Sequence, residues 1–296
     1  MKDQNTNIFS EYIGRSLGAF ILMLVLVITA SAIIMGGGLT GRDSLKICTL
    51  EPAPAPRTSA LHTVLATVEK RKIIVSPPGR IDIQDCDLLV VPAFSWLTDP
   101  DMFDGEPVGS IAAFPDRSGD ALIVVPGDGR LQTLAHLSVE EIHFSSPRSL
   151  NCCWNQLQAL HERGLPLPSR LDKLHFGSGA GEECDHTLIA LLSGTAAAGA
   201  CRSGTVEDLK RAGILAPDAV AIVARQPALP EMLIISKHDN TAYCRQLLER
   251  ARNALSAGGS PAANEARPII LGTLTPETLR RMNAIGLLIA KYRGQF

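Results

Sequence analysis

Short runs of consecutive apolar residues alternate with longer amphipathic stretches over most of the chain. Runs such as residues 45–50, 86–92 and 121–127 are typical of strands that are buried on both faces. Stretches such as residues 58–70 and 241–255 repeat apolar positions at helical spacing, which predicts helices with one buried face. Because such strands and helices follow one another along the chain, the pattern predicts an α/β fold with parallel sheets covered on both sides.

One apolar stretch is too long for a strand. Residues 17–36, from Leu17 to Gly36, carry no charge over about 20 positions, enough for a helix to cross a hydrocarbon layer of roughly 30 Å. We therefore expect a single transmembrane anchor after an N-terminal tail, residues 1–16, and before a spacer, residues 37–43. A cleaved signal peptide ending at Ala30-Ser31-Ala32 and a buried core helix are the alternatives. Apolar residues continue beyond this small-residue motif, which favours the uncleaved anchor.

Charge and cysteine content exclude several classes of partner. Lys and Arg total 28 against 30 Asp and Glu, so the 296-residue chain has no basic field for a nucleic acid. The seven cysteines include no CxxC motif and no Cys/His spacing suited to zinc. We expect no metal and no cofactor. Buried reduced thiols, which behave as small hydrophobic side chains, are the simplest interpretation of the cysteines.

The sequence SSPRSLNCC, residues 145–153, lies between a predicted strand and a predicted helix. Ser149 is suitably placed to cap that helix by accepting a hydrogen bond from the backbone N–H of Asn151 or Cys152. The same helix start would also suit an anion, because the first turn leaves free N–H groups and Arg148 adds a cation. Both interpretations stay open at this point.

The order of elements resembles a known family. The segments SVEEIHFSSPRS, DHTLIALLSGTAAAGAC and VAIVARQPALPEMLII are similar to the second lobe of type II periplasmic solute-binding proteins, in the phosphonate- and phosphite-binding branch of ABC importers. The resemblance implies an α/β fold of two lobes that close on a ligand by a hinge motion. It places lobe one at residues 44–118 plus 232–256, lobe two at 119–224 and a crossing segment at 225–231. The transmembrane helix and residues 258–296, a linker and a C-terminal amphipathic helix, lie outside it.

The resemblance also implies a ligand site. The oxyanion-binding helix start of the family corresponds to Pro147-Arg148-Ser149-Leu150-Asn151, where Leu150 and Asn151 replace two hydroxyl residues. A family histidine aligns with Cys184, and a ligand-capping aromatic residue falls near Ser95 or Trp96, although Trp96 is equally suited to core packing. The residues expected to bind ligand are Ser146, Arg148, Ser149, Asn151, Cys184, Asp185, Ser95 and Trp96.

The function implied is a membrane-anchored protein that captures a small oxyanion, such as a phosphonate, phosphite or phosphate, for an ABC permease. The anchor would lie in the inner membrane and the large domain in the periplasm, where a bridge between Cys184 and Cys152 or Cys153 would form. The alternative is a binding-protein fold whose cleft has lost its ligand and serves as a structural, accessory or sensor subunit of a membrane complex. An enzyme is not expected, because no nucleophile motif surrounds Cys152 or Cys153.

Overall fold

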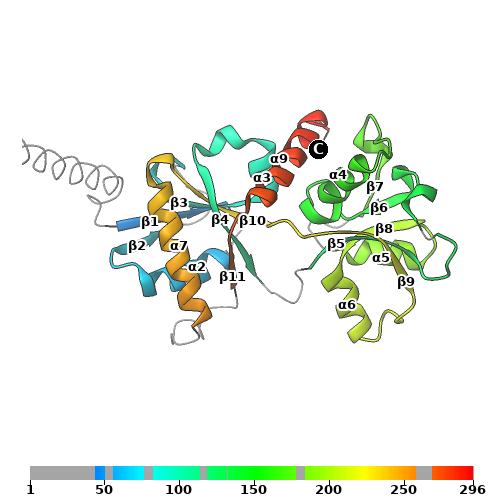
Figure 1. Cartoon of the computed structure of the whole chain (residues 1–296), viewed down its shortest axis with the longest axis horizontal. Helices are drawn as coiled ribbons and strands as arrows, with labels where there is room; N and C mark the ends of the chain where they lie inside the picture. The colour runs from blue at the N-terminus through cyan, green and yellow to red at the C-terminus, as the bar shows by residue number, and fades with distance from the viewer. Residues whose placement is uncertain are drawn as a thin grey trace, which may run out of the picture. The chain divides into compact units, whose positions relative to one another are not determined.

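The apolar runs form the strands of two separate sheets (Figure 1). The computed structural model describes residues 44–50, 56–76, 83–113, 119–131, 133–177, 184–257 and 269–295. The first sheet has the order β11-β4-β10-β3-β1-β2 and the second has β7-β6-β8-β5-β9. The first contains β1 (Ser44–Thr49), β2 (Lys72–Val75), β3 (Leu88–Pro92), β4 (Glu106–Ala113), β10 (Met232–Ser236) and β11 (Ile269–Gly272). The second contains β5 (Ala121–Pro126), β6 (Ile142–Phe144), β7 (His175–Phe176), β8 (Ala198–Arg202) and β9 (Val220–Gln226).

Helices connect most of these strands. The α-helices are α2 (Pro56–Val68), α3 (Ala93–Thr98), α4 (Asn155–Glu162), α5 (Asp185–Leu192), α6 (Ser203–Arg211), α7 (Thr241–Ser256) and α9 (Pro276–Lys291). One π-helical turn, η6 (Leu150–Trp154), leads directly into α4. Short 3-10 turns are found at Ile83–Asp85, Pro100–Phe103, Leu134–His136, Val139–Glu141, Leu171–Lys173 and His238–Asn240.

Parallel pairing, expected throughout, is found in only part of each sheet. Strand β1 pairs in parallel with β2 and β3, and β6 pairs in parallel with β7 and β8. In contrast, β10 pairs antiparallel with β3 and β4, and β5 pairs antiparallel with β8 and β9. The chain leaves the first sheet after β4 and returns to it at β10. Each antiparallel pair contains a strand next to one of these crossings, namely β4, β5 or β10.

Burial of both faces of β5 explains why its sequence is apolar at every position. Ile123 and Val125 belong to one buried cluster together with Leu157 and Leu160 of α4. The alternate residues Leu122 and Val124 belong to a second buried cluster with Leu188 and Leu191 of α5. Because successive side chains of a strand point to opposite faces, helices on both sides of the second sheet require apolar residues throughout β5.

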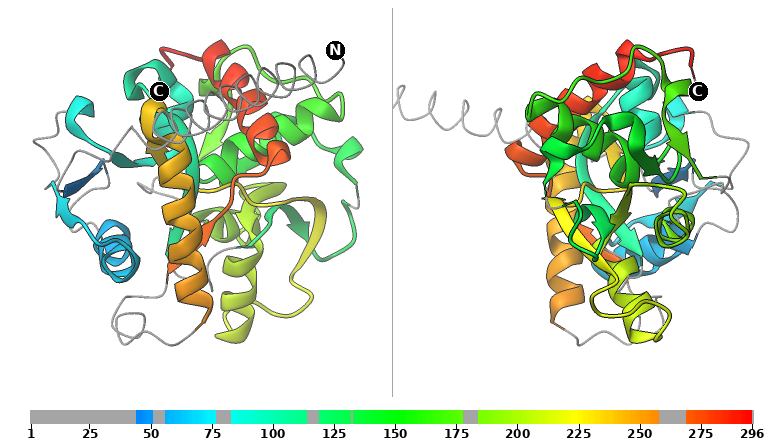
Figure 2. Two further views of the ribbon diagram at one scale, coloured as in Figure 1. Left: turned by 60° about the vertical axis from the view of Figure 1, so that its left-hand side comes forward. Right: turned by 90° about the vertical axis from the view of Figure 1, so that its right-hand side faces the viewer.

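The C-terminal helix α9 contacts elements of both sheets. It packs against α3, which follows β3, and against α4 and η6 of the second sheet (Figure 2). Its buried residues are Met282, Ile285, Leu288 and Ile289, with Tyr292 just beyond the helix. This burial shows that the C-terminal amphipathic helix docks on the domain that precedes it. The strand β11, which the sequence did not predict, pairs with β4 ahead of this helix.

The expected transmembrane anchor, residues 17–36, lies outside the described residues, as do the tail and spacer on either side of it. Among the described residues, no helix is both long and apolar enough to cross a membrane. Ser44–Phe296 forms one compact unit that contains both sheets.

Candidate ligand-binding site

The helix start at Ser149 is closed by its own hydrogen bonds. The Ser149 Oγ accepts a hydrogen bond of 3.0 Å from the backbone N–H of Cys152, and its carbonyl accepts one of 3.3 Å from Trp154 N–H. Ser146 Oγ accepts a bond of 3.2 Å from the backbone N–H of Arg148. Ser149 therefore acts as the helix cap that the sequence suggested, and its side chain is buried.

The Asn151 side chain ties this helix start to the segment that returns to the first sheet. Its Nδ2 donates to the Leu229 carbonyl at 2.9 Å, and its Oδ1 accepts from Leu229 N–H at 2.8 Å. One turn later, Asn155 Nδ2 donates to the carbonyl of Pro227 at 3.1 Å. Asn151 is fully buried, so its amide is used as a backbone mimic that fixes the crossing segment against η6.

Two disulfide bonds join cysteines that are distant in sequence. Cys48, in β1, is bonded to Cys86, and Cys152, in η6, is bonded to Cys184, just before α5. The second bond confirms the bridge expected between Cys184 and the pair at 152 and 153. It also means that Cys184 occupies the aligned histidine position as a structural residue, because a disulfide sulfur has no proton to donate to a ligand.

The described cysteines outside these bonds are Cys153, Cys201 and Cys244, and all are buried. Burial raises the pKa of the Cys153 thiol far above its ordinary value and raises that of Cys201 to about 12. Because the thiolate is the reactive form, neither group is a nucleophile near neutral pH. The interpretation of cysteines as small hydrophobic residues holds for these three.

The other expected site residues have different environments. Arg148 and Asp185 have exposed side chains, at the starts of η6 and α5. Ser95 and Trp96 lie in α3 and are half-buried, with Trp96 packed against the main hydrophobic cluster. The indole Nε1 of Trp96 is buried and finds no hydrogen-bond acceptor among the described residues. The fold thus places Ser146, Arg148, Ser149, Asn151, Cys184 and Asp185 at helix starts of the second sheet, and Ser95 and Trp96 in the helix after β3.

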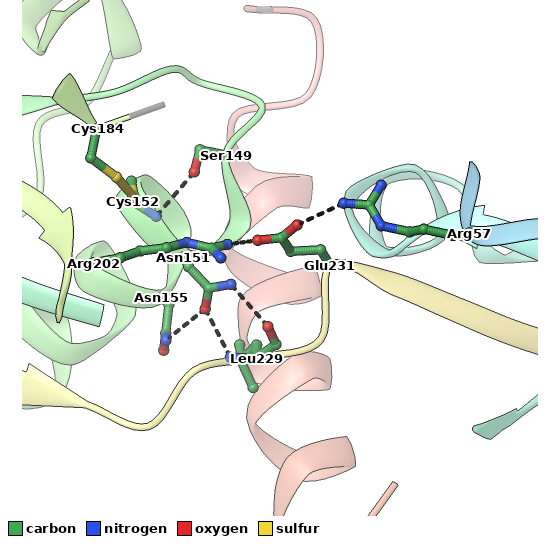
Figure 3. A network of polar contacts seen from close by, with 9 residues as sticks. All are labelled: Arg57, Ser149, Asn151, Cys152, Asn155, Cys184, Arg202, Leu229 and Glu231. Carbon is green, nitrogen blue, oxygen red and sulfur yellow. Dashed lines mark hydrogen bonds and ion pairs between the residues drawn. A yellow bond between two sulfur atoms is a disulfide. The ribbon is translucent and has the colours of Figure 1, made fainter. Parts of the chain in front are cut away.

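A cluster of charged residues that the sequence analysis missed lies between the two sheets. Glu231 Oε2 lies 3.5 Å from Nη2 of Arg57, and Glu231 Oε1 is in direct contact with Nη2 of Arg202. Figure 3 shows the two arginine side chains pointing toward Glu231 from opposite sides, next to Ser149 and Asn151. The Arg202 side chain is only 10% exposed, whereas those of Arg57 and Glu231 are each 25% exposed.

Each of these three residues lies at the end of a strand or in the segment next to one. Arg57 lies in the first turn of α2, which follows the carboxyl end of β1, and Arg202 is the last residue of β8. Glu231 immediately precedes β10, and its carbonyl accepts a bond of 2.7 Å from Ala93 N–H, at the carboxyl end of β3. Ligands of open α/β sheets bind outside the carboxyl ends of parallel strands. The cluster therefore lies where such a fold places its ligand, with one cation contributed beside each sheet.

A surface pocket lies elsewhere on the second sheet. It is lined by Pro126 and Gly127 at the end of β5, by Leu191 and Leu192 at the end of α5, and by Asp128, Asp218 and Ala219. Because β5 runs antiparallel to β8, this pocket is beside the amino end of β8 and not beside Arg202. Its two aspartates give it the wrong charge for an oxyanion.

Two α/β sheets joined by crossing segments are the architecture of two-lobed solute-binding proteins. The family model described as "ABC transporter, phosphonate, periplasmic substrate-binding protein" matches residues 87–268. The chain belongs to this family, whose members are periplasmic proteins that bind substrates for ABC transporters and are not enzymes. The resemblance inferred from the sequence is thereby confirmed. No curated protein matches the sequence in a direct search.

Solved structures share the fold at low sequence identity. XAC2383 from Xanthomonas citri, bound to ATP, is 14% identical with a TM-score of 0.55, over 86% of this chain and 99% of that one. The same protein bound to a chloride ion is 15% identical with a TM-score of 0.53, over 86% and 100%. A TctC solute-binding protein from Polaromonas, without ligand, is 11% identical with a TM-score of 0.55, over 86% and 99%.

Proposed function

We propose that this protein captures a small oxyanion of the phosphonate, phosphite or phosphate type and presents it to an ABC permease. The observation that carries the proposal is the pair of arginines, Arg57 and Arg202, that converge from the two sheets at the carboxyl ends of their strands. Guanidinium groups bind phosphorus oxyanions through charge-assisted hydrogen bonds. A ligand held by one arginine from each lobe would also favour hinge closure, because both contacts form only when the lobes approach.

The residues expected from the sequence would then divide into two roles. Ser149, Asn151 and Cys184 would hold the frame of the site, because their polar groups and sulfur are already engaged within the protein. The rim that the ligand meets would be formed by Ser146, Arg148, Asp185, Ser95 and Trp96. Among these, the exposed Arg148 is the added cation best suited to attract an anion toward the arginine pair.

Membrane attachment is the second part of the proposal. The uncharged residues 17–36 would anchor the protein in the inner membrane with Ser44–Phe296 on the periplasmic side. A tethered binding protein would stay close to its permease, where a short linker gives a high effective concentration. Fractionation of cells that express the full-length chain tests this part: recovery of the intact protein in the soluble periplasmic fraction would contradict it.

Isothermal titration of the full-length chain in detergent micelles tests ligand capture. Methylphosphonate, phosphite and phosphate are the probes, and ATP is added because the similar fold of XAC2383 was solved with it. We expect saturable binding of at least one phosphorus oxyanion, weakened by added salt because the contacts are ionic. Glycerol, a neutral molecule of similar size, is the control. Absence of saturable binding by every anion would overturn the proposal.

A second candidate function rests on the same contacts. Glu231 already lies between the two arginines, and Asn151 is already hydrogen-bonded to Leu229, so these groups have partners within the protein in this conformation. A binding-protein fold that keeps these internal contacts would serve as an accessory or sensor subunit of a membrane complex. Detergent-solubilised pull-down of the full-length chain distinguishes this function: a stable membrane partner without anion binding would support it.

A further inference from the structure

Glu231 is bound by the two arginines in the way that an anionic ligand would be. Each of its carboxylate oxygens faces a different guanidinium group, Oε2 toward Arg57 at 3.5 Å and Oε1 in contact with Arg202. The two arginines come from different sheets, so a single carboxylate links them across the space between α2 and β8 (Figure 3). One negative charge is thus placed between two positive charges.

The backbone of Glu231 is fixed independently of its side chain. The Glu231 carbonyl accepts a hydrogen bond of 2.7 Å from Ala93 N–H, and the next residue, Met232, begins β10. The Glu231 side chain is 25% exposed and flexible, with the carboxylate at its end. A rotation about the side-chain bonds can therefore withdraw the carboxylate while every backbone contact of Glu231 is kept.

We infer that Glu231 is an internal ligand that occupies an oxyanion site formed by Arg57 and Arg202, and that an external anion binds by displacing it. The inference rests on the proposed function, since it concerns the same cleft. A carboxylate and a phosphonate are recognised by guanidinium groups through the same charge-assisted hydrogen bonds. The tethered carboxylate competes at an effective concentration on the order of millimolar, so a ligand must bind more strongly than a free carboxylate does.

This competition selects a chemical class of ligand. A monoanion such as a sulfonate would replace one negative charge by another and would gain little over the tethered carboxylate. A phosphonate or phosphate dianion brings two negative charges and three oxygens to the two guanidinium groups, so it is attracted to them more strongly than a carboxylate is. We therefore assign the site to dianionic phosphorus oxyanions in preference to sulfonates and carboxylates.

The test compares Glu231→Gln with the unchanged protein, using the full-length chain in detergent micelles at pH 8. Methylphosphonate and methanesulfonate are the probes, because they share a tetrahedral shape and differ by one charge at this pH. In the unchanged protein we expect methylphosphonate to bind at least ~10-fold more tightly than methanesulfonate. In Glu231→Gln, which keeps the shape of the side chain and removes the competing charge, both anions should bind ~10-fold to ~100-fold more tightly, as expected when an internal competitor occupies most of the population.

Two further variants test whether the gain in affinity depends on Glu231 and Arg202 in particular. Glu106→Gln removes a carboxylate that pairs with Arg245 at 3.4 Å, at the opposite end of the β4–β10 pair, and should leave both affinities unchanged. Arg202→Gln combined with Glu231→Gln should abolish the gain in affinity. If thermal unfolding shows that Glu231→Gln does not fold, Glu231→Asp replaces it, because the shorter carboxylate competes less well and should give a smaller gain of the same sign.

Each outcome bears on a different conclusion. Equal or weaker binding by a folded Glu231→Gln, with methylphosphonate still bound by the unchanged protein, overturns the internal ligand and leaves the proposed function standing. Equal affinity of the unchanged protein for methylphosphonate and methanesulfonate overturns the assigned ligand class. Absence of binding by both the unchanged protein and the variant overturns the proposed function itself. Binding by Glu231→Gln alone supports the internal ligand and assigns the unchanged protein to the accessory function.

Discussion

The helix start around Ser149, residues 145–154, and the arginine pair, Arg57 and Arg202 with Glu231, are neighbouring polar regions built on opposite principles. In the helix start, the Ser149 hydroxyl binds a backbone N–H of its own turn, and the Asn151 amide binds both polar groups of Leu229. In the arginine pair, both guanidinium groups contact the carboxylate of Glu231, whose side chain is partly exposed. Ser149 and Asn151 could accept a ligand only by losing structural hydrogen bonds, whereas the arginine pair would need only a rotation of the Glu231 side chain.

This difference means that the helix start contributes mainly to the stability of the protein, whereas the arginine pair contributes mainly to ligand binding. Buried hydrogen bonds such as those of Asn151 are costly to break, because an unpaired backbone group in the interior loses its solvation. The Glu231 side chain is 25% exposed, and the guanidinium groups that hold it can bind an external anion strongly in its place. We therefore expect changes of Ser149, Asn151 and the disulfide to lower the free energy of unfolding, and replacement of Arg57 or Arg202 to lower affinity.

The largest expected effect on stability comes from the disulfide of the helix start. Replacement of both Cys152 and Cys184 by Ala should lower the free energy of unfolding by about 3 to 4 kcal/mol, because the bond closes a loop with a separation of 32 residues. Urea denaturation without reducing agent measures the change. The matched pair Cys48 and Cys86, with a separation of 38, should show a loss of similar size. A loss below about 1 kcal/mol would show that this bond does not hold the helix start.

The largest expected effect on binding comes from Arg202. Arg202→Gln should weaken methylphosphonate binding by at least ~100-fold, about 3 kcal/mol, because a buried guanidinium contact to the anion is lost. Titration calorimetry provides the affinity. The control is Arg225→Gln, which breaks an exposed pair with Asp120 at 2.8 Å in the same sheet and should leave the affinity unchanged. An unchanged affinity in Arg202→Gln would contradict the assignment of binding to the arginine pair, since binding would then depend on another region.

The amide of Asn151 should affect stability more than affinity. Asn151→Ala leaves the N–H and carbonyl of the buried Leu229 without their partner, which should cost about 2 kcal/mol in the free energy of unfolding. Chemical denaturation measures this cost. Asn253→Ala, on the exposed side of α7, should change stability by less than about 0.5 kcal/mol. A similar small change in Asn151→Ala would mean that its hydrogen bonds are dispensable.

The smallest expected effect is that of the helix cap. Ser149→Ala should lower the free energy of unfolding by about 1 kcal/mol, because the N–H of Cys152 loses its acceptor. Its affinity for methylphosphonate should change by less than about 2-fold, and Ser149→Thr should restore the stability. A 10-fold loss of affinity with unchanged stability would instead make Ser149 a direct ligand-binding residue, the other of the two roles that the sequence left open.

The central strands could be predicted from sequence because their apolar runs are uninterrupted. Strands β3, β5 and β10 are buried throughout most of their length, so no polar position breaks the pattern. Strand β4 was missed because its sequence, EPVGSIAA, includes a proline and a glycine that local rules assign to a turn. The structure explains the glycine: a Cβ at Gly109 would lie 3.0 Å from the Leu248 side chain of α7.

The candidate site was predictable only where it is local in sequence. Ser149 and Asn151 stand out because they begin a helix directly after a strand, a pattern visible within a few residues. Arg57 and Glu231 are 174 positions apart, and their meeting depends on how two sheets are connected. The position of Arg57 at a helix start after a strand was the one signal that could have suggested it. No local rule assigns Glu231 to the same place.

The helix α9 makes the order of synthesis matter for this protein. Met282, Ile285, Ile289 and Tyr292 belong to the same buried cluster as core residues of both sheets. These residues follow the members of that cluster from both sheets in the sequence, so the cluster cannot be completed until α9 has been synthesised. A chain interrupted before residue 276 would keep both sheets but expose the apolar surfaces of α3 and α4 that α9 covers. Release of α9 from the ribosome is therefore the step that allows the cluster shared by the two sheets to close.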